Sequence, residues 1–160
     1  CIRDRFYPFQ SFTRGKKIDL RDVPFLIEAS SSGLEKQLIW VGKKISRTVL
    51  TCNSHNRSYL HLAGVFASNF SNHMLTIAQD IAKENGFSEK LILPLVAETI
   101  NKSLQIGPEN AQTGPAIRHD YNTIEQHQEM LDEHGSWKAI YHIISRDIMN
   151  KYEDPDGEGT

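Results

Sequence analysis

Short apolar runs and one helical repeat organise the first third of the chain. Residues 24–29 form a compact apolar run of the length of a buried strand, and residues 48–51 form a shorter one. Ser30–Gly33 is typical of a turn and helix start, after which apolar residues recur at helical spacing: Leu34, Leu38, Val41 and Ile45. Strand, helix and strand in this order predict part of a parallel sheet, with too few strands to be stable alone.

An aromatic segment precedes these elements. Residues 5–9 predict a short strand that Pro8 ends, and residues 15–17 predict a turn. An aromatic–proline turn after a strand can form an apolar wall for a flat ring, although an ordinary strand end is the commoner explanation of the same residues.

A long uncharged segment follows. No Lys, Arg, Asp or Glu occurs from Ser58 to Gln79, and these 22 residues are long enough to span a bilayer. The segment nevertheless contains many side chains that are costly in lipid: His61, Ser68, Asn69, Ser71, Asn72, His73 and Thr76. We therefore expect no membrane span, but a long helix that is buried inside protein on most sides.

Three further helices are predicted, with Ser88 and Asp120 as the caps of the first two, over residues 88–104, 120–134 and 136–149. The acidic residues, Pro and Gly of residues 151–160 predict a disordered tail. The expected organisation is an incomplete α/β part, a helical part and this tail.

The composition is that of a soluble globular protein. The chain has 160 residues, of which 39% are hydrophobic and 24% charged, which excludes a disordered chain, a collagen and a disulfide scaffold. The net charge of −2 argues against a general nucleic-acid binder. Residues 1–57 carry 11 basic against 5 acidic residues, and residues 58–160 carry 7 against 15, which indicates two parts with different roles.

The two cysteines, Cys1 and Cys52, form no recognisable pairing pattern, so we expect a reducing compartment and a cytoplasmic protein. The chain begins with Cys1 instead of Met, which favours a fragment or a sequence that lacks its N-terminus.

Candidate chemistry lies first on the long helix. At about 100° per residue, one polar stripe gathers His61, Ser68, Asn69, Asn72 and Thr76, with His73 beside it. Asn side chains there can hold a carbonyl or hydroxyl and a His can move a proton, so the stripe can line a ligand cavity. Hydrogen bonds to neighbouring helices explain the same residues, because buried polar groups need partners. Both interpretations stay open.

A second candidate is the loop from Gln112 to Asp120. Gly114 and Pro115 shape a tight turn, and Asp120 can cap the next helix. Arg118 can make a bidentate contact to an anion. The local pattern favours the simpler interpretation, a helix–helix connection with a cap and a surface ion pair.

Several other chemistries find no support in the sequence. The seven His and two Cys lack the spacings of a standard zinc site, and neither a Gly-x-Ser-x-Gly motif nor a Gly-rich phosphate loop occurs. We therefore predict no metal site.

Three segments carry a family resemblance: Tyr7-Pro-Phe-Gln-Ser-Phe12, His61-Leu-Ala-Gly-Val-Phe-Ala-Ser-Asn-Phe-Ser-Asn-His73 and Gln112-Thr-Gly-Pro-Ala-Ile-Arg-His-Asp120. With these segments the chain resembles, over about residues 1–150, a bacterial family of Rossmann-like proteins whose C-terminal domain has no assigned function. That family is similar to pyrroline-5-carboxylate reductase and, more distantly, to the β-hydroxyacid dehydrogenases.

The resemblance implies a fold and a function. Residues 1–53 would be an α/β remnant, the last strands and helix of a Rossmann-like NAD(P)-binding domain. Residues 54–150 would be an all-α domain resembling the 6-phosphogluconate dehydrogenase C-terminal domain, which forms a homodimer through its long helix. The complete protein would be an NADP- or NAD-dependent oxidoreductase that acts on a small carbonyl, imine or alcohol.

The resemblance also implies roles for single residues. Tyr7, Pro8 and Gln10 would lie at the carboxyl end of a strand, where doubly wound sheets bind ligands, and would contact the cofactor. The catalytic candidates are His61, Asn69, Asn72 and His73. The substrate-binding candidates are Ser68, Gln112, Thr113 and Arg118.

Two departures leave other functions open. The Gly-x-Gly-x-x-Gly loop is absent from these 160 residues, and Ser68 to Asn72 stands where the β-hydroxyacid dehydrogenases have a Lys and an Asn one turn apart. The alternatives are a non-catalytic dimer that binds a nucleotide or metabolite, and a purely structural dimerisation domain.

Overall fold

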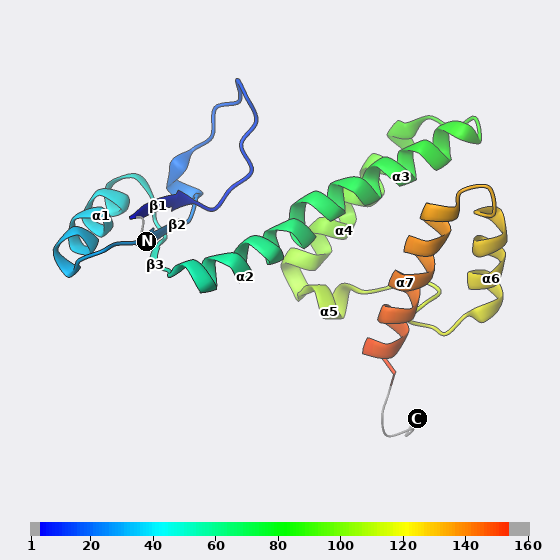
Figure 1. The fold of residues 1–160 in the computed structure, drawn as a ribbon. Coiled ribbons are helices and arrows are strands. Elements are labelled where there is room, and N and C mark those ends of the chain that lie inside the picture. The colour runs from blue at the N-terminus through cyan, green and yellow to red at the C-terminus, as the bar shows by residue number, and fades with distance from the viewer. Residues whose placement is uncertain (1–3, 154–160) are drawn as a thin grey trace. The chain divides into compact units, whose positions relative to one another are not determined.

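The chain forms two compact units, one that ends at Leu75 and one that begins at Thr76. The computed structural model describes residues 4–153, so most of the predicted tail lies outside the described residues. The first unit holds a small sheet and the start of a long helical run, and the second is helical (Figure 1). The division falls inside the helical run.

The sheet of the first unit is built around its middle strand. In chain order the elements before the helical run are β1 (Arg5–Pro8), η1 (a 3-10 turn, Leu20–Asp22), β2 (Phe25–Glu28), α1 (Ser32–Ile45) and β3 (Val49–Thr51). β2 pairs parallel to β3 and antiparallel to β1. The parallel β2–α1–β3 unit confirms the predicted strand–helix–strand order. β1 runs antiparallel, a direction that residue periodicity does not encode.

Burial in the first unit concentrates on β2 and on residues that flank the strands. Phe25 and Ile27 are buried, Ile27 completely. The Phe6 ring packs on Phe25 with centroids 4.8 Å apart. α1 approaches the sheet closely at Gly42, where a Cβ would lie only 3.0 Å from Val49. Glycine at this position lets the helix backbone reach the sheet.

Polar residues at both ends of α1 satisfy backbone groups. The Ser31 hydroxyl accepts a hydrogen bond from the Leu34 N–H, as a helix start requires. At the other end, the buried Ser46 hydroxyl donates to the Val23 carbonyl at 2.6 Å. This second bond ties the end of α1 to the chain just before β2.

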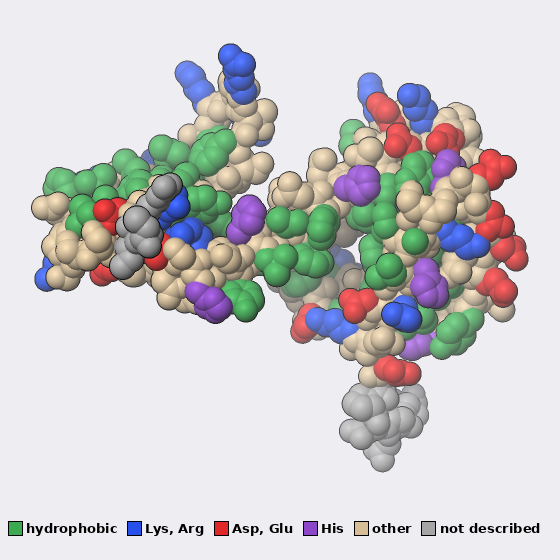
Figure 2. Space-filling view, viewed as in Figure 1, with side chains coloured by type: hydrophobic (Ala, Val, Ile, Leu, Met, Phe, Trp, Pro, Cys, Tyr) green, Lys and Arg blue, Asp and Glu red, His purple; other side chains and the backbone are tan. Residues whose placement is uncertain are grey.

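The predicted long helix is a run of three segments: α2 (Ser54–Gly64), the π-helical η2 (Val65–Phe70) and α3 (Ser71–Glu84). The expectation that this helix is buried on most sides is wrong for the chain described. None of its residues is buried, and Tyr59, Leu62 and Phe66 each expose more than half of their surface. Figure 2 shows apolar side chains at the surface of both units. A periodic pattern identifies an apolar face, but the surface that covers it can come from outside the chain.

The second unit continues with one 3-10 turn and four helices: η3 (Glu89–Ile92), α4 (Leu93–Ile106), α5 (Pro108–Ala111), α6 (Tyr121–Met130) and α7 (Gly135–Lys151). Ser88 caps η3, which runs directly into α4, and Asp120 caps α6 as predicted. α6 ends earlier than predicted, whereas α7 continues to Lys151, the first residue of the predicted tail. None of the helices between residues 4 and 153 is long and apolar enough to cross a membrane.

Replacing Gly42 by Val will destabilise the first unit. The new side chain would meet Val49 and Phe6, and overpacking of this kind lowers the free energy of unfolding by about 1–3 kcal/mol. Gly33 of the same helix has no neighbour within 4 Å, so Gly33→Val is the control and should change it by less than about 0.5 kcal/mol. Urea unfolding measures both variants. Equal effects at the two positions would contradict the close approach of α1 to the sheet.

Candidate functional site

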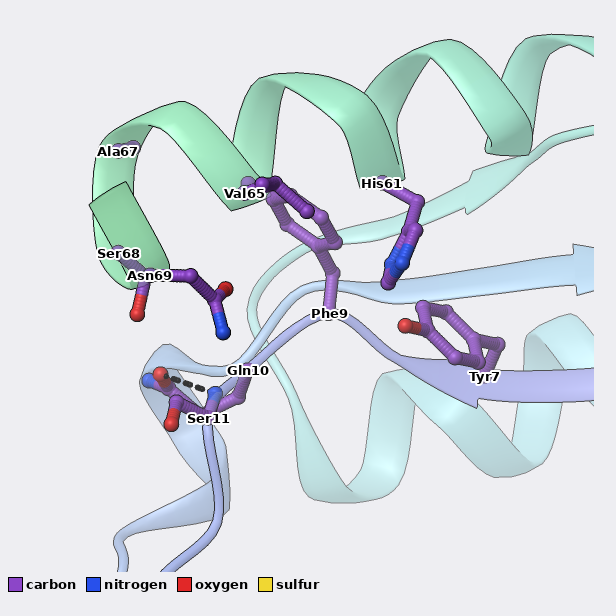
Figure 3. Close-up of a pocket in the computed structure, with 10 residues that line it drawn as sticks. Tyr7, Phe9, Gln10, Ser11, His61, Val65, Ala67, Ser68 and Asn69 are labelled. Carbon is purple, nitrogen blue, oxygen red and sulfur yellow. Dashed lines mark hydrogen bonds between the residues drawn. The ribbon is translucent and has the colours of Figure 1, made fainter. Parts of the chain in front are cut away.

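A cavity of about 290 Å³ opens in the first unit between the end of β1 and the helical run (Figure 3). Its lining comes from the strand end (Tyr7, Phe9, Gln10, Ser11) and from α2 and η2 (His61, Gly64, Val65, Ala67, Ser68, Asn69). None of these residues is a Lys, Arg, Asp or Glu. The cavity therefore offers hydroxyl, amide, imidazole and aromatic groups without a permanent charge.

Backbone and side-chain contacts place the strand side of the cavity. The Phe9 N–H donates to the Pro24 carbonyl at 2.8 Å, which continues the contact between the two chain segments past the end of β1. The Gln10 side-chain carbonyl accepts the Ser11 N–H at 2.8 Å. The Phe9 ring lies 3.2 Å from where a Cβ of Gly64 would be. Glycine at position 64 thus lets the helical run approach the strand end.

Side chains from the helical run complete the site. Figure 3 shows His61 pointing from α2 toward Tyr7, and Asn69 pointing from η2 toward the segment of Gln10 and Ser11. Tyr7 and His61 also line a second cavity of about 350 Å³, to which Arg57 and Ser58 contribute. An imidazole and a phenol, each able to donate and accept a hydrogen bond, therefore line both cavities.

One carboxylate holds the start of the helical run against the sheet. Glu28, the last residue of β2, accepts hydrogen bonds from the Ser54 N–H at 3.0 Å, the Ser54 hydroxyl at 2.8 Å and the Arg57 guanidinium at 2.7 Å. The side chains of Glu28 and Arg57 are only 18% and 15% exposed. The hydrogen bond from Arg57, followed by those from Ser54, lowers the pKa of Glu28. These bonds hold the first turn of α2, which the Asn53 side chain caps, against the end of β2.

The structure brings part of the predicted site together. Five of the predicted residues line the cavity: Tyr7, Gln10, His61, Ser68 and Asn69. Three others, Pro8, Asn72 and His73, are not among its lining residues, and Gln112, Thr113 and Arg118 belong to the second unit. The predicted polar stripe assumed a regular α-helix, and the π-helical segment interrupts that periodicity. As a result, Asn72 does not line the cavity with His61, Ser68 and Asn69.

Sequence patterns do not single out Ser11 or the Glu28–Arg57 pair, whereas Phe9 belongs to the aromatic segment that predicted an apolar wall. The two members of that pair are separated by 29 positions, so no local spacing connects them. One feature of the sequence could have pointed to Glu28. It is a carboxylate at the end of an apolar run, and a charge beside a buried strand needs a partner.

The loop from Gln112 to Asp120 is held by contacts inside the second unit. The Asp120 carboxylate accepts hydrogen bonds from the Thr123 hydroxyl at 2.7 Å and the Thr123 N–H at 3.1 Å, and these bonds lower the pKa of Asp120. The Gln112 amide donates to the Thr113 carbonyl, and Ala116 is buried. These contacts agree with the simpler interpretation of the loop, a capped helix–helix connection.

A second polar cluster joins helices of the second unit. His127 of α6 and the Tyr141 hydroxyl of α7 share a 2.9 Å hydrogen bond, and Glu84 of α3 pairs with His134 at 3.1 Å. His134 also stacks on Trp137, with centroids 4.1 Å apart. Both pairs line a cavity of about 460 Å³, and each connects two elements, so we interpret the cluster as structural. Across residues 4–153, no group of three or more His, Cys, Asp or Glu could hold a metal ion.

Comparison with known families identifies the group to which the chain belongs. Residues 23–148 match the sequence profile of a domain of unknown function, DUF2520. The chain belongs to the DUF2520 family. The match includes Glu28, His61 and Asn69, whereas Tyr7 and Gln10 precede it. The helical side of the cavity is therefore part of the DUF2520 domain.

Two solved structures resemble this DUF2520 chain. A Bacteroides fragilis protein that is described as a proposed NADP oxidoreductase is 38% identical, with a TM-score of 0.86 and 92% of this chain covered. A Thermotoga maritima protein is 22% identical, with a TM-score of 0.78 and 94% covered, and shows the fold alone. The chain spans 57% and 62% of the lengths of these two proteins. A comparison with curated proteins gave no match.

The small sheet followed by helices is consistent with part of a Rossmann-like domain joined to a helical domain. The narrower likenesses, to pyrroline-5-carboxylate reductase, the β-hydroxyacid dehydrogenases and the 6-phosphogluconate dehydrogenase C-terminal domain, stay predictions.

Acid will weaken the first unit through Glu28. Because its folded-state pKa is lowered, the stabilisation by Glu28 is present above the ordinary pKa of glutamate and is lost as the pH falls through the lowered value. We expect Glu28→Gln to have a lower Tm than the unmodified protein at neutral pH, and the difference to shrink on acidification. Thermal unfolding over a pH series measures this, with Glu98→Gln at an exposed position of α4 as the control. A Tm difference that is independent of pH would contradict the role of the carboxylate charge.

Proposed function

We propose that this DUF2520 chain forms the substrate side of an NAD(P)-dependent oxidoreductase that acts on a small carbonyl, imine or alcohol. The observation that carries the proposal is the uncharged cavity in which His61, Ser68 and Asn69 of the helical run face the end of β1. The similarity to a protein described as a proposed NADP oxidoreductase supports the same class of activity.

The residues present suit the ring end of a nicotinamide cofactor. Tyr7 and Phe9 offer aromatic surface, and Gln10, Ser11 and Asn69 offer the neutral donors and acceptors that a carboxamide needs. The same residues do not suit a pyrophosphate, because the lining contains no Lys or Arg and the 160 residues contain no Gly-x-Gly-x-x-Gly loop. Phosphate binding would therefore fall to residues outside this chain.

His61 is the proposed proton donor and acceptor. A bound nicotinamide supplies the hydride in reduction and accepts it in oxidation. His61 gives its ring proton to the substrate oxygen or nitrogen in reduction and takes it back in oxidation, so that an alcohol or amine is the reduced product. His61 lines the second cavity as well, which provides a path along which the imidazole can exchange this proton with solvent.

Ser68 and Asn69 are the proposed orienting residues. Their hydroxyl and carboxamide can hydrogen-bond the polar atom of the substrate and hold it within reach of His61. The cavity volume of about 290 Å³ restricts the substrate to a small molecule. In the predicted resemblance to the β-hydroxyacid dehydrogenases, Ser68 stands at the position of their lysine, and the proposal therefore assigns the proton to a histidine.

Replacing His61 by Gln in the full-length protein tests the proton role. NADPH oxidation across a panel of small aldehydes, ketones and cyclic imines identifies a substrate, for which kcat should fall about a hundredfold to ten-thousandfold in the variant. Asn69→Ala should lower kcat/KM about three- to tenfold, the value of one hydrogen bond. Asn101→Ala, at an exposed position of α4, is the control and should leave turnover unchanged.

Two outcomes would contradict different parts of this proposal. NADPH binding by the full-length protein without turnover of any compound in the panel would contradict an enzyme and favour a non-catalytic binding protein. Turnover that survives His61→Gln unchanged would remove the histidine from the mechanism and leave the class of activity intact.

We also propose that two copies of the chain associate through their helices. The run from α2 to α3 has no buried residue, and α4 exposes 67% of Leu95 and 80% of Leu104. Exposed apolar surface of this kind is typical of a protein–protein interface. A second copy brings the same apolar surface, as a two-fold interface requires.

Size-exclusion chromatography with light scattering should give twice the mass of one chain for the full-length protein. Leu62→Glu places a charge on the exposed apolar face of α2 and should shift the protein to the mass of one chain, because a charge buried in an interface without a partner is costly. Lys36→Glu on the exposed surface of α1 is the control. A single-chain mass for the unmodified protein would show that residues outside this chain cover the apolar faces instead.

A further inference from the structure

The helical run departs from α-helical geometry where it lines the cavity. The π-helical segment spans Val65–Phe70, and regular α-helix resumes at Ser71. In a π turn the hydrogen bond reaches five residues along the chain instead of four, so the turn holds an extra residue. Short π segments inside α-helices are rare and are found frequently at functional sites.

This wide turn contributes both orienting residues of the cavity. Ser68 and Asn69, which both belong to this turn, line the cavity. Asn72 and Thr76, which α-helical spacing places on the same stripe, are not among the lining residues. The position of the wide turn therefore decides which polar side chains face the cavity.

Ser71 makes a hydrogen bond that matches the wide turn. Its hydroxyl donates to the Phe66 carbonyl, five residues back, at 3.0 Å. Three hydroxyls in regular α-helices donate instead to the carbonyl four residues back, at distances between 2.8 and 3.0 Å: Ser58 to Ser54, Thr99 to Leu95 and Ser103 to Thr99. The same chemical group thus takes a different acceptor at the π segment, and its bond closes the five-residue span.

The hydrogen bond from Ser71 to Phe66 spans the residues of the turn that line the cavity. The bond from Ser71 to Phe66 encloses Ser68 and Asn69, and the rings of Phe66 and Phe70 meet edge to face, with centroids 5.0 Å apart, across the same turn. Ser71 is not itself among the lining residues. Any effect it has on a bound molecule must therefore pass through the conformation of the turn.

We propose that Ser71 is a positioning residue, whose hydroxyl holds the wide turn at Val65–Phe70 and so sets the orientation of Ser68 and Asn69 at the cavity. The consequence for turnover rests on the proposed function, whereas the effect on the turn does not. Without the hydroxyl, a regular α-helical turn competes with the π turn, and it presents Ser68 and Asn69 to the cavity in a different orientation relative to His61.

Two matched variants of the full-length protein test this role. Ser71→Ala removes the hydroxyl at the π segment, and Ser103→Ala removes one from a regular α-helix. The NMR signals of the Ser68 and Asn69 amides report the turn without any substrate, and they should shift in Ser71→Ala and stay in place in Ser103→Ala. With the substrate from the panel, kcat/KM should fall about three- to tenfold in Ser71→Ala only, the value of one net hydrogen bond.

A second pair of variants applies if Ser71→Ala does not fold. Thr and Val have nearly the same shape, and only Thr keeps the hydroxyl. The Asn69 amide signals should therefore stay at their original positions in Ser71→Thr and shift in Ser71→Val. Asn69 signals that stay in place without the hydroxyl would overturn the positioning role, whether or not the protein is an oxidoreductase. Shifted signals in a protein that has no turnover would support the positioning role and contradict only the proposed function.

Discussion

The carboxylate of Glu28 is the contact on which the candidate site depends. A charge at low exposure is tolerated only where its partners satisfy it, and Glu28 finds its partners, Ser54 and Arg57, in the first turn of α2. The hydrogen bonds that stabilise the charge therefore also set the direction in which the helical run leaves the sheet. His61, about two turns further on, takes its place beside Tyr7 as a result.

A second contact, of Phe9 on Gly64, holds the helical run to the end of β1. The two sides of the cavity are therefore joined to the end of β1 and to the helical run, which pack on each other at Phe9 and Gly64. A site that must hold a small molecule in one orientation requires such support. The π-helical segment follows directly after Gly64. It carries two neighbouring polar side chains of the cavity lining, Ser68 and Asn69.

Charged pairs elsewhere in the chain stabilise its local structure. The hydrogen bond from Lys151 lowers the pKa of Glu109 and ties the end of α7 to α5, and the side-chain bond from Arg21 lowers the pKa of Asp19 to about 2. The cavity is lined instead by groups without a permanent charge. Neutral donors and acceptors suit the binding of a carbonyl, imine or hydroxyl group better than the binding of an anion, which is consistent with the proposed class of substrate.

Local sequence was sufficient to predict β2, α1, β3 and the capped start of α6, because apolar periodicity and capping by residues such as Asp120 act within a few positions. It also placed His61, Ser68 and Asn69 on one helical run. The direction of β1, the pairing of Glu28 with Arg57 and the π turn became known only from the packed chain. The first two join residues that are far apart in sequence, and the third is a choice between hydrogen bonds to the fourth or fifth residue, which side-chain periodicity does not reveal. The exposure of the helical run likewise became known only from the structure. A sequence pattern shows which side chains are apolar, but not what surface covers them.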